Sequence, residues 1–313
     1  MSRIPIRPIA LFLTIAVGGG WLVASPLWIS GQGLAMPGAT VLLVVMMFVP
    51  TLAAWITGRV LPSGQSFLTT TTVRPAVPFR RWLPYAILAW LAPIALMAAS
   101  LGLAALLGVY RFDLEHFSGA TALLEEASGG VPLPMPVALI VLIQLVSLPF
   151  APAVNVIPAL GEDLGWRGFL QTQLLPLGQW PAVLITGVVW GLWHAPVILL
   201  GYNYPGYQPF AALGMMVVFC VLVSVLLGWL TIASGTVWTA AIGHGFINGV
   251  AGVGALLSTA GPVDTGTAGL LGYTGWICMG VLVLVLVALR RFPVRGAAPA
   301  PPTAGFRSDA PAA

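Results

Sequence analysis

The chain has 313 residues, of which 59% are hydrophobic and only 6% are charged. Soluble domains carry about 25% charged residues, so this composition, with a mean hydropathy of +1.00, excludes a soluble globular protein. The formal net charge is +4, and all 12 cationic side chains are arginines. Because these arginines flank apolar stretches, they indicate a membrane topology rather than a site for nucleic acid.

Eight apolar stretches are long enough to cross about 30 Å of hydrocarbon as helices, which rise about 1.5 Å per residue. They cover residues 9–29, 39–57, 82–109, 136–159, 181–200, 210–232, 237–258 and 270–289. The first stretch is longer than the apolar core of a cleavable signal peptide, so we interpret it as a retained anchor. The sequence therefore predicts an all-α fold, a polytopic transmembrane helix bundle with about eight spans.

The distribution of arginines predicts the orientation of this bundle. If the N-terminus is cytoplasmic, eight spans return the C-terminus to the same side, and only Arg111 lies in an outer loop. The inner segments then carry Arg3, Arg7, Arg59, Arg74, Arg80, Arg81, Arg167, Arg290, Arg291, Arg295 and Arg307. This bias follows the positive-inside rule and predicts a multi-pass protein of the cell membrane with both termini cytoplasmic. The Lys-free composition, rich in Ala, Gly and Arg, points to a bacterial plasma membrane.

Few polar side chains lie at membrane depth, where each charge costs at least about 2.5–3.5 kcal/mol. The titratable residues in or beside the spans are Glu162, Asp163, Arg167, His194 and His244. Asp163 and Arg167 stand four residues apart and can pair on one helical face, whereas Glu162 points about 100° away from Asp163. The same spacing places Trp190 beneath the imidazole ring of His194.

His244 also has a partner four residues later, since Asn248 shares its helical face. A carboxylate can take a proton from water, imidazoles can position that water or a metal ion, and an amide N–H can stabilise an oxyanion. Together these groups fit the hydrolysis of a peptide bond. Taken singly, each also fits a structural role: an ion pair at a helix end, a hydrogen-bonded core histidine, or a polar contact between helices.

Three motifs in order carry a resemblance to a known family. GEDLGWRGFL at 161–170, WGLWHAPV at 190–197 and HGFINGV at 244–250 resemble the CPBP intramembrane proteases. This family includes the type 2 CAAX prenyl proteases and bacterial relatives that process bacteriocins or confer immunity. Its motifs are two glutamates followed by an arginine, a phenylalanine four residues before a histidine, and a histidine four residues before an asparagine.

The resemblance implies a role for each matching residue. Glu162 would activate water, His194 would orient that water, and His244 with Asn248 would stabilise the oxyanion. Arg167 would hold the carboxylate region in place. The implied enzyme is an intramembrane endopeptidase, of glutamic or metallo type, whose partners are the lipid bilayer and a membrane-anchored peptide or protein.

Two positions depart from the family pattern, since Asp163 replaces the second glutamate and Trp190 replaces the phenylalanine. Asp163 stands in a supporting position, and Trp190 keeps an aromatic ring that can reshape the pocket. Whether the family uses a metal ion is disputed. A divalent metal stays an open cofactor, but the chain has no HExxH motif, so its spacing does not support zinc.

The family resemblance and the apolar stretches together divide the chain into four segments. We expect N-terminal transmembrane helices and a cytoplasmic linker over 1–135, and a CPBP-like catalytic core over 136–258. The last transmembrane helix would occupy 259–295, and 296–313 would form a disordered cytoplasmic tail.

Three other functions compete with the protease interpretation. A catalytically silent relative would bind a membrane partner as an immunity or scaffold protein, which the intact Glu162, His194, His244 and Asn248 argue against. A proton-coupled transporter would use the same titratable residues as a relay, but the sequence has no evident repeat symmetry. A rhomboid-like serine protease would use Ser234, which lies at a span boundary only ten residues before His244.

Overall fold

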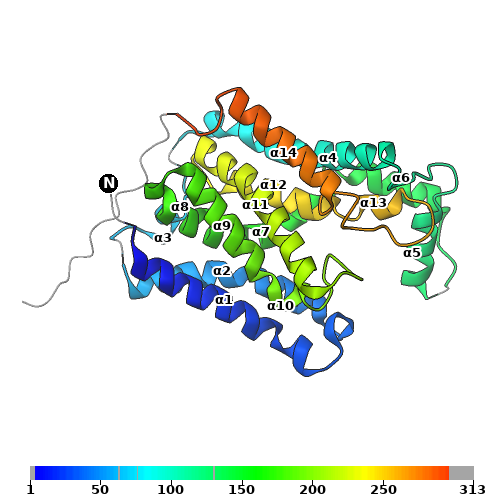
Figure 1. Ribbon diagram of the computed structural model, residues 1–313, viewed down its shortest axis with the longest axis horizontal. Coiled ribbons are helices and arrows are strands. Elements are labelled where there is room, and N and C mark those ends of the chain that lie inside the picture. Colours follow the sequence, from blue (N-terminus) through cyan, green and yellow to red (C-terminus); the bar gives the residue numbers. More distant parts are fainter. Residues whose placement is uncertain (1–3, 63, 76, 130, 296–313) are drawn as a thin grey trace, which may run out of the picture.

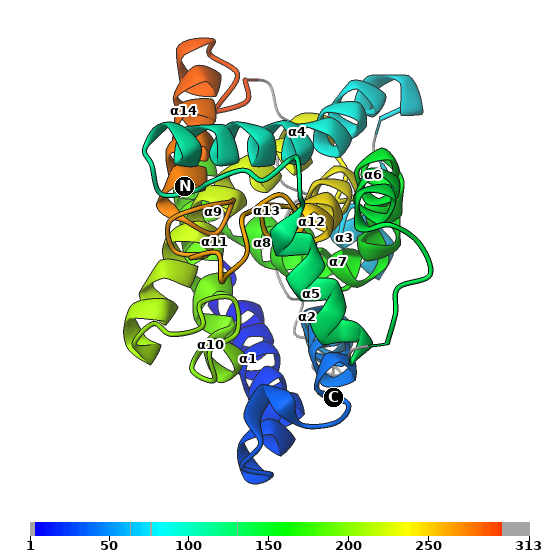
Figure 2. The ribbon, with the colours of Figure 1, turned by 90° about the vertical axis from the view of Figure 1, so that its right-hand side faces the viewer.

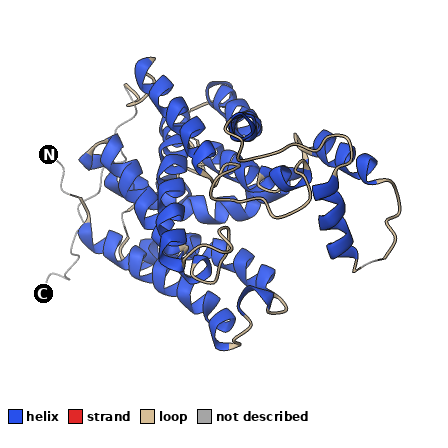
Figure 3. Ribbon diagram, turned by 45° about the vertical axis from the view of Figure 1, so that its right-hand side comes forward, coloured by secondary structure: helices blue, strands red, loops and turns tan. Residues whose placement is uncertain are grey.

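The computed structural model describes residues 4–62, 64–75, 77–129 and 131–295 (Figure 1). Over these residues the fold is helical and contains no strand, apart from one isolated bridge between Phe112 and Ser258 (Figure 3). The all-α prediction is confirmed. The predicted disordered tail, 296–313, lies outside the described residues.

Five helical segments are long and apolar enough to cross a membrane, and they coincide with five of the predicted spans. They are α1 (Ile6–Ile29), α2 (Ala39–Val60), α4 (Phe79–Leu106), α11 (Pro209–Ser234), and α12 (Trp238–Val250) continued by α13 (Val253–Leu256). The outer faces of the long helices expose large apolar side chains such as Leu22, Val41 and Leu88. Such faces suit contact with lipid rather than water, so the chain is a multi-pass membrane protein.

The remaining helices are shorter than a full span. They are α3 (Phe67–Thr70), α5 (Ser118–Ser128), α6 (Val137–Ser147), α9 (Gln179–Trp193), α10 (Ala195–Ile198) and α14 (Tyr273–Ala288), with a 3-10 turn η1 (Gly33–Ala35). α14 lies within the last predicted span and is only 16 residues long. Among the described residues, five of the eight predicted spans therefore correspond to helices that are long enough to cross a membrane.

The predicted fourth span, 136–159, is wrong as a single helix. Helix α6 ends at Ser147, a 3-10 segment η2 (Ala151–Asn155) follows, and a new helix begins at Val156. Pro149 lies in the break, and proline lacks the N–H that an α-helix requires. The indole of Trp90 on α4 donates a hydrogen bond to the Pro149 carbonyl (2.6 Å) and anchors the break to the bundle.

The helix that follows carries the first motif, which the sequence analysis left between two spans. It is continuous from α7 (Val156–Asp163) through a π-helical turn η3 (Leu164–Leu170) to α8 (Gln171–Leu174) and η4 (Leu175–Leu177). Most side chains from Gly161 to Leu174 are buried. Because protein rather than lipid surrounds this helix, it needs no continuous apolar run, and a hydropathy criterion misses it.

Glycines allow this helix to approach its neighbours closely. A Cβ atom on Gly161 would lie 2.8 Å from the Phe48 ring, and one on Gly165 would lie 2.6 Å from the Pro50 carbonyl oxygen, both on α2. The hydroxyl of Thr51 donates to the Gly161 carbonyl (2.5 Å). Small residues at such contacts are a common way for membrane helices to pack.

The predicted fifth span, 181–200, is interrupted at His194. Helix α9 ends at Trp193, and α10 begins one residue later. Pro196 cannot donate the N–H that would continue the helix, so the backbone turns after the second motif. His194 therefore lies at the end of a helix, not in the middle of a span.

Figures 1 and 2 show how these helices are arranged. α1 and α2 lie side by side along one edge of the bundle, and α4 with α14 lies along the opposite edge. α7, α9, α11 and α12 fill the space between them, with α7 in contact with both α2 and α12. The three motifs, on α7, α9 and α12, are thus all central.

The glycine contact at the centre of the bundle gives a testable expectation. Gly165→Ala forces a methyl group against the Pro50 backbone, which should lower the free energy of unfolding by about 1–3 kcal/mol. Gly102→Ala on α4 is the matched control, because a Cβ there meets no atom within 4 Å and alanine favours helix. Thermal unfolding in detergent measures both; equal melting temperatures for the two variants would contradict the packing argument.

Candidate active site

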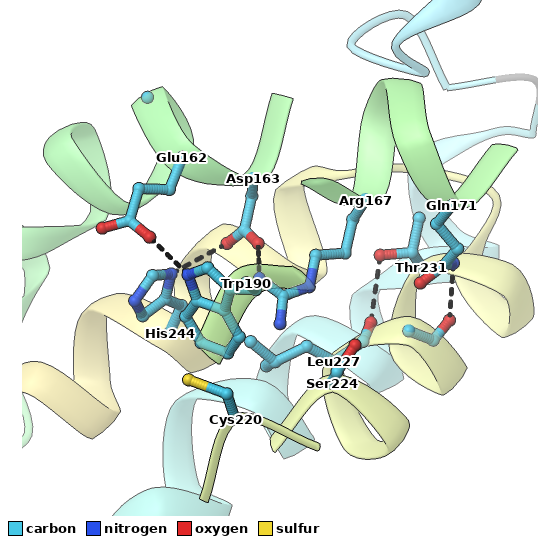
Figure 4. A network of polar contacts seen from close by, with 12 residues as sticks. Glu162, Asp163, Arg167, Gln171, Trp190, Cys220, Ser224, Leu227, Thr231 and His244 are labelled. Carbon is cyan, nitrogen blue, oxygen red and sulfur yellow. Dashed lines mark hydrogen bonds and ion pairs between the residues drawn. The ribbon is translucent and has the colours of Figure 1, made fainter. Parts of the chain in front are cut away.

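Glu162 lies at the end of α7 and is only 3% exposed. Its Oε2 accepts a hydrogen bond from the indole Nε1 of Trp190 (2.7 Å) on α9 (Figure 4). This bond holds one carboxylate oxygen, while the hydrogen bonds of the described residues leave Oε1 unused. Glu162 therefore presents a free oxygen from a restrained side chain.

Asp163 is fully buried and serves two partners. Its Oδ1 accepts from the Arg167 guanidinium (Nη1, 2.8 Å), and its Oδ2 lies 3.2 Å from Nδ1 of His244. An aspartate paired with arginine is an acceptor only, so His244 Nδ1 carries the hydrogen and Nε2 stays available. The sequence predicted the pair with Arg167 but missed the contact with His244, which joins α7 to α12.

Arg167 is fully buried as well, with its guanidinium carbon 4.0 Å from the centre of the Trp190 ring. Its Nε and Nη2 atoms have no hydrogen-bond partner within the described part of the chain. The aspartate and the indole face offset part of the cost of burying this charge. Arg167, which the sequence analysis counted among the inner-segment arginines, lies inside the helix bundle with its side chain buried.

His194 is also restrained through Nδ1, which lies 2.8 Å from the Trp190 carbonyl oxygen. A carbonyl can only accept, so Nδ1 carries the hydrogen and Nε2 keeps its lone pair. The rings of Trp190 and Trp193 flank the imidazole, with centroids 5.6 and 4.9 Å away. Both histidines thus have one ring nitrogen occupied and the other available.

Trp190 connects the whole cluster. Its indole N–H holds Glu162, its carbonyl holds His194, one face of its ring lies under Arg167, and the ring packs edge-on against His244. The sequence predicted only the packing against His194. A tryptophan in place of phenylalanine adds an N–H donor, but its partner Glu162 stands 28 positions away, so no local pattern in the sequence identifies this contact.

A cavity of about 450 Å³ collects these groups. Its polar lining includes Glu162, His194, His244 and Asn248, from α7, the end of α9, and α12. Trp190 also lines it, whereas Asp163 and Arg167 lie behind this lining. Glu162, near the end of α7, and His194, directly after α9, thus meet at one cavity.

Two connecting segments, 199–208 and 258–272, border this cavity, and the sequence analysis did not single them out. Tyr202, Asn203 and Thr265 line it, and the Thr265 hydroxyl donates to the Asn203 carbonyl (2.6 Å). The Tyr207 hydroxyl donates to Asp264 (2.7 Å), a bond that raises the pKa of Tyr207 to about 12. The phenol stays protonated at physiological pH, so it keeps the two segments joined.

The described residues contain no group of three His, Cys, Asp or Glu side chains placed to hold a metal ion. The geometry therefore does not support the metalloprotease alternative.

Comparison with known proteins identifies one family. Residues 144–250 match the family model described as Type II CAAX prenyl endopeptidase Rce1-like. This range holds all three motifs, and the match confirms the resemblance to the CPBP family. The curated proteins contained no match to the chain.

Substitutions in the buried ion pair test how much it affects the free energy of unfolding. Asp163→Asn leaves the Arg167 cation without a counter-charge, which should lower the free energy of unfolding by about 3–5 kcal/mol. Replacing both members with apolar residues, as Asp163→Leu with Arg167→Met, should recover much of that loss, because no charge then stays buried. Denaturant titration in detergent micelles compares the variants, and a double variant less stable than Asp163→Asn would refute this explanation.

Proposed function

We propose that this chain, which carries an Rce1-like domain of the CAAX-type intramembrane proteases at residues 144–250, is a glutamic endopeptidase that cuts a membrane-anchored protein or peptide. The observation that carries the proposal is that four residues from three helices line one cavity inside an apolar bundle, namely Glu162, His194, His244 and Asn248. The restraints on the first three of these side chains support it further.

Glu162 acts as the general base. Its free Oε1 takes a proton from a water molecule, and the water oxygen attacks the carbonyl carbon of the scissile peptide bond. The tetrahedral intermediate that forms carries negative charge on the former carbonyl oxygen. When the C–N bond breaks, the protonated Glu162 returns its proton to the leaving amine, so the carboxylate is regenerated.

The histidines have different tasks in this scheme. His194 accepts a hydrogen bond from the attacking water at Nε2, because its Nδ1 donates to the Trp190 carbonyl. Asn248 donates from its amide to the oxyanion. The Asp163 carboxylate holds His244 through Nδ1 on the helical face that this ring shares with Asn248, so His244 shapes the oxyanion side of the cavity.

The surroundings of the cavity favour a membrane-anchored substrate. Its lining is mainly apolar and includes Met46, Met97 and Met216, and the helices around it expose apolar faces outward. A peptide bond that reaches Glu162 must enter this apolar bundle, so a segment attached to the bilayer has the shortest route. We therefore expect the enzyme and its substrate to be embedded in the same bilayer.

The role of Glu162 is tested by Glu162→Gln. The amide oxygen can still accept from Trp190, so the protein should fold with an unchanged melting temperature, while the loss of the base should reduce cleavage by more than about 10³-fold. The measurement uses purified protein in phosphatidylcholine liposomes with a library of peptides that each carry one transmembrane anchor.

Two outcomes would argue against the assignment. Full activity in Glu162→Gln would show that another group is the base. A well-folded wild-type protein that cleaves no peptide in the library would favour a silent, partner-binding relative. Glu126→Gln on α5, where the side chain is exposed and does not line the cavity, is the control for the same substitution away from the proposed base.

A further inference from the structure

A second hollow lies next to the proposed catalytic cavity. It measures about 280 Å³ and separates α6 from the segment formed by α12 and α13. Its polar members are Gln144 and Ser147 on α6 and Asn155 just before α7. None of these three residues belongs to the motifs that define the proposed active site.

Asn155 connects the two hollows, because it lines both. It precedes Glu162 by seven residues, which is two helical turns, so it lies near the face that carries the proposed base. The backbone at Asn155 also approaches α12 closely, since a Cβ on Gly245 would lie 3.0 Å from the Asn155 carbonyl carbon. The second hollow therefore adjoins the cavity where the peptide bond would be cut, with Asn155 in the wall of both.

Helix α6 carries two polar side chains, Gln144 and Ser147, among otherwise apolar residues. Leu139, Leu142 and Val146 on the same helix are exposed, as lipid-facing residues would be, whereas Gln144 and Ser147 line the hollow. The hydrogen bonds of the described residues use neither the Gln144 side chain nor the Asn155 side chain. Both amides are half-buried, so they are free to hydrogen-bond to a ligand that offers donors and acceptors.

Glycines keep the opposite wall open. Gly249 and Gly252 line the hollow, and a Cβ on Gly252 would meet no heavy atom within 4 Å. The backbone of Gly252 has φ −80°, which any residue can adopt. A side chain at this position would therefore fill the hollow without straining the fold.

We infer that this hollow is a subsite for an extended peptide segment on one side of the scissile bond. The amides of Gln144 and Asn155 hydrogen-bond to the N–H and C=O groups of the segment, and Gly252 leaves room for its side chains. This inference rests on the proposed endopeptidase function. It adds a determinant of substrate length and position outside the proposed catalytic residues.

The test fills the hollow with Gly252→Leu and measures cleavage of anchored peptides that are shortened step by step on either side of the cut bond. Wild-type kcat/KM should rise when the segment that enters the hollow is present. Gly252→Leu should remove that gain, about 10-fold, and leave cleavage of the shortest peptide unchanged. Gln144→Leu should reduce the gain for the same peptides.

Gly280→Leu on α14 is the matched control, because a Cβ at Gly280 also meets nothing within 4 Å and the residue lines neither hollow. It should keep the wild-type dependence on length. A Gly252→Leu protein with the wild-type dependence on length would overturn the subsite while leaving the protease intact. A wild-type protein that cleaves no peptide of any length would instead contradict the proposed function, and the subsite with it.

Discussion

The ion pair between Asp163 and Arg167 is the interaction on which the rest of the proposed site depends. Both side chains are fully buried, and the pair is completed by the Trp190 ring below the guanidinium and by His244 on the other aspartate oxygen. A charge inside an apolar bundle is tolerated only when partners surround it. Those partners come from three helices, so satisfying the pair also aligns α7, α9 and α12.

This alignment determines where the reactive groups point. Because Trp190 lies under Arg167, its N–H reaches Glu162 and its carbonyl reaches His194. Because Asp163 holds His244, the other nitrogen of that ring stays available. The π-helical turn begins directly after Asp163, and π-helical turns often occur at functional sites. One buried pair thus restrains three of the four residues proposed to act on substrate.

The sequence predicted much of this arrangement from local patterns. Composition predicts the five apolar runs, and helical spacing predicts the pair of Asp163 and Arg167. The three motifs were instead identified by their resemblance to the CPBP family. The prediction of helices from apolar runs failed for the helix that is surrounded by protein instead of lipid. The helix that carries Glu162 is covered by α2 and α12, so its polar residues and glycines resemble a loop in a hydropathy profile.

The contacts that the sequence could not predict are those between residues far apart in the chain. Asp163 meets His244 across 81 positions, and Trp190 meets Glu162 across 28. No periodicity within one helix specifies such partners, since they depend on how helices pack. The continuous span predicted over 181–200 runs through Pro196, and only the fold shows that α9 ends at Trp193 and leaves His194 at its end.

In the proposed mechanism, protein groups alone activate the water at Glu162. The most direct measurement is cleavage of an anchored peptide by wild-type protein in liposomes after exhaustive chelation, with the metal content determined on the same sample. Metal-free protein should cleave the peptide at an unchanged rate. Activity that disappears on chelation and returns with a divalent cation would contradict this mechanism.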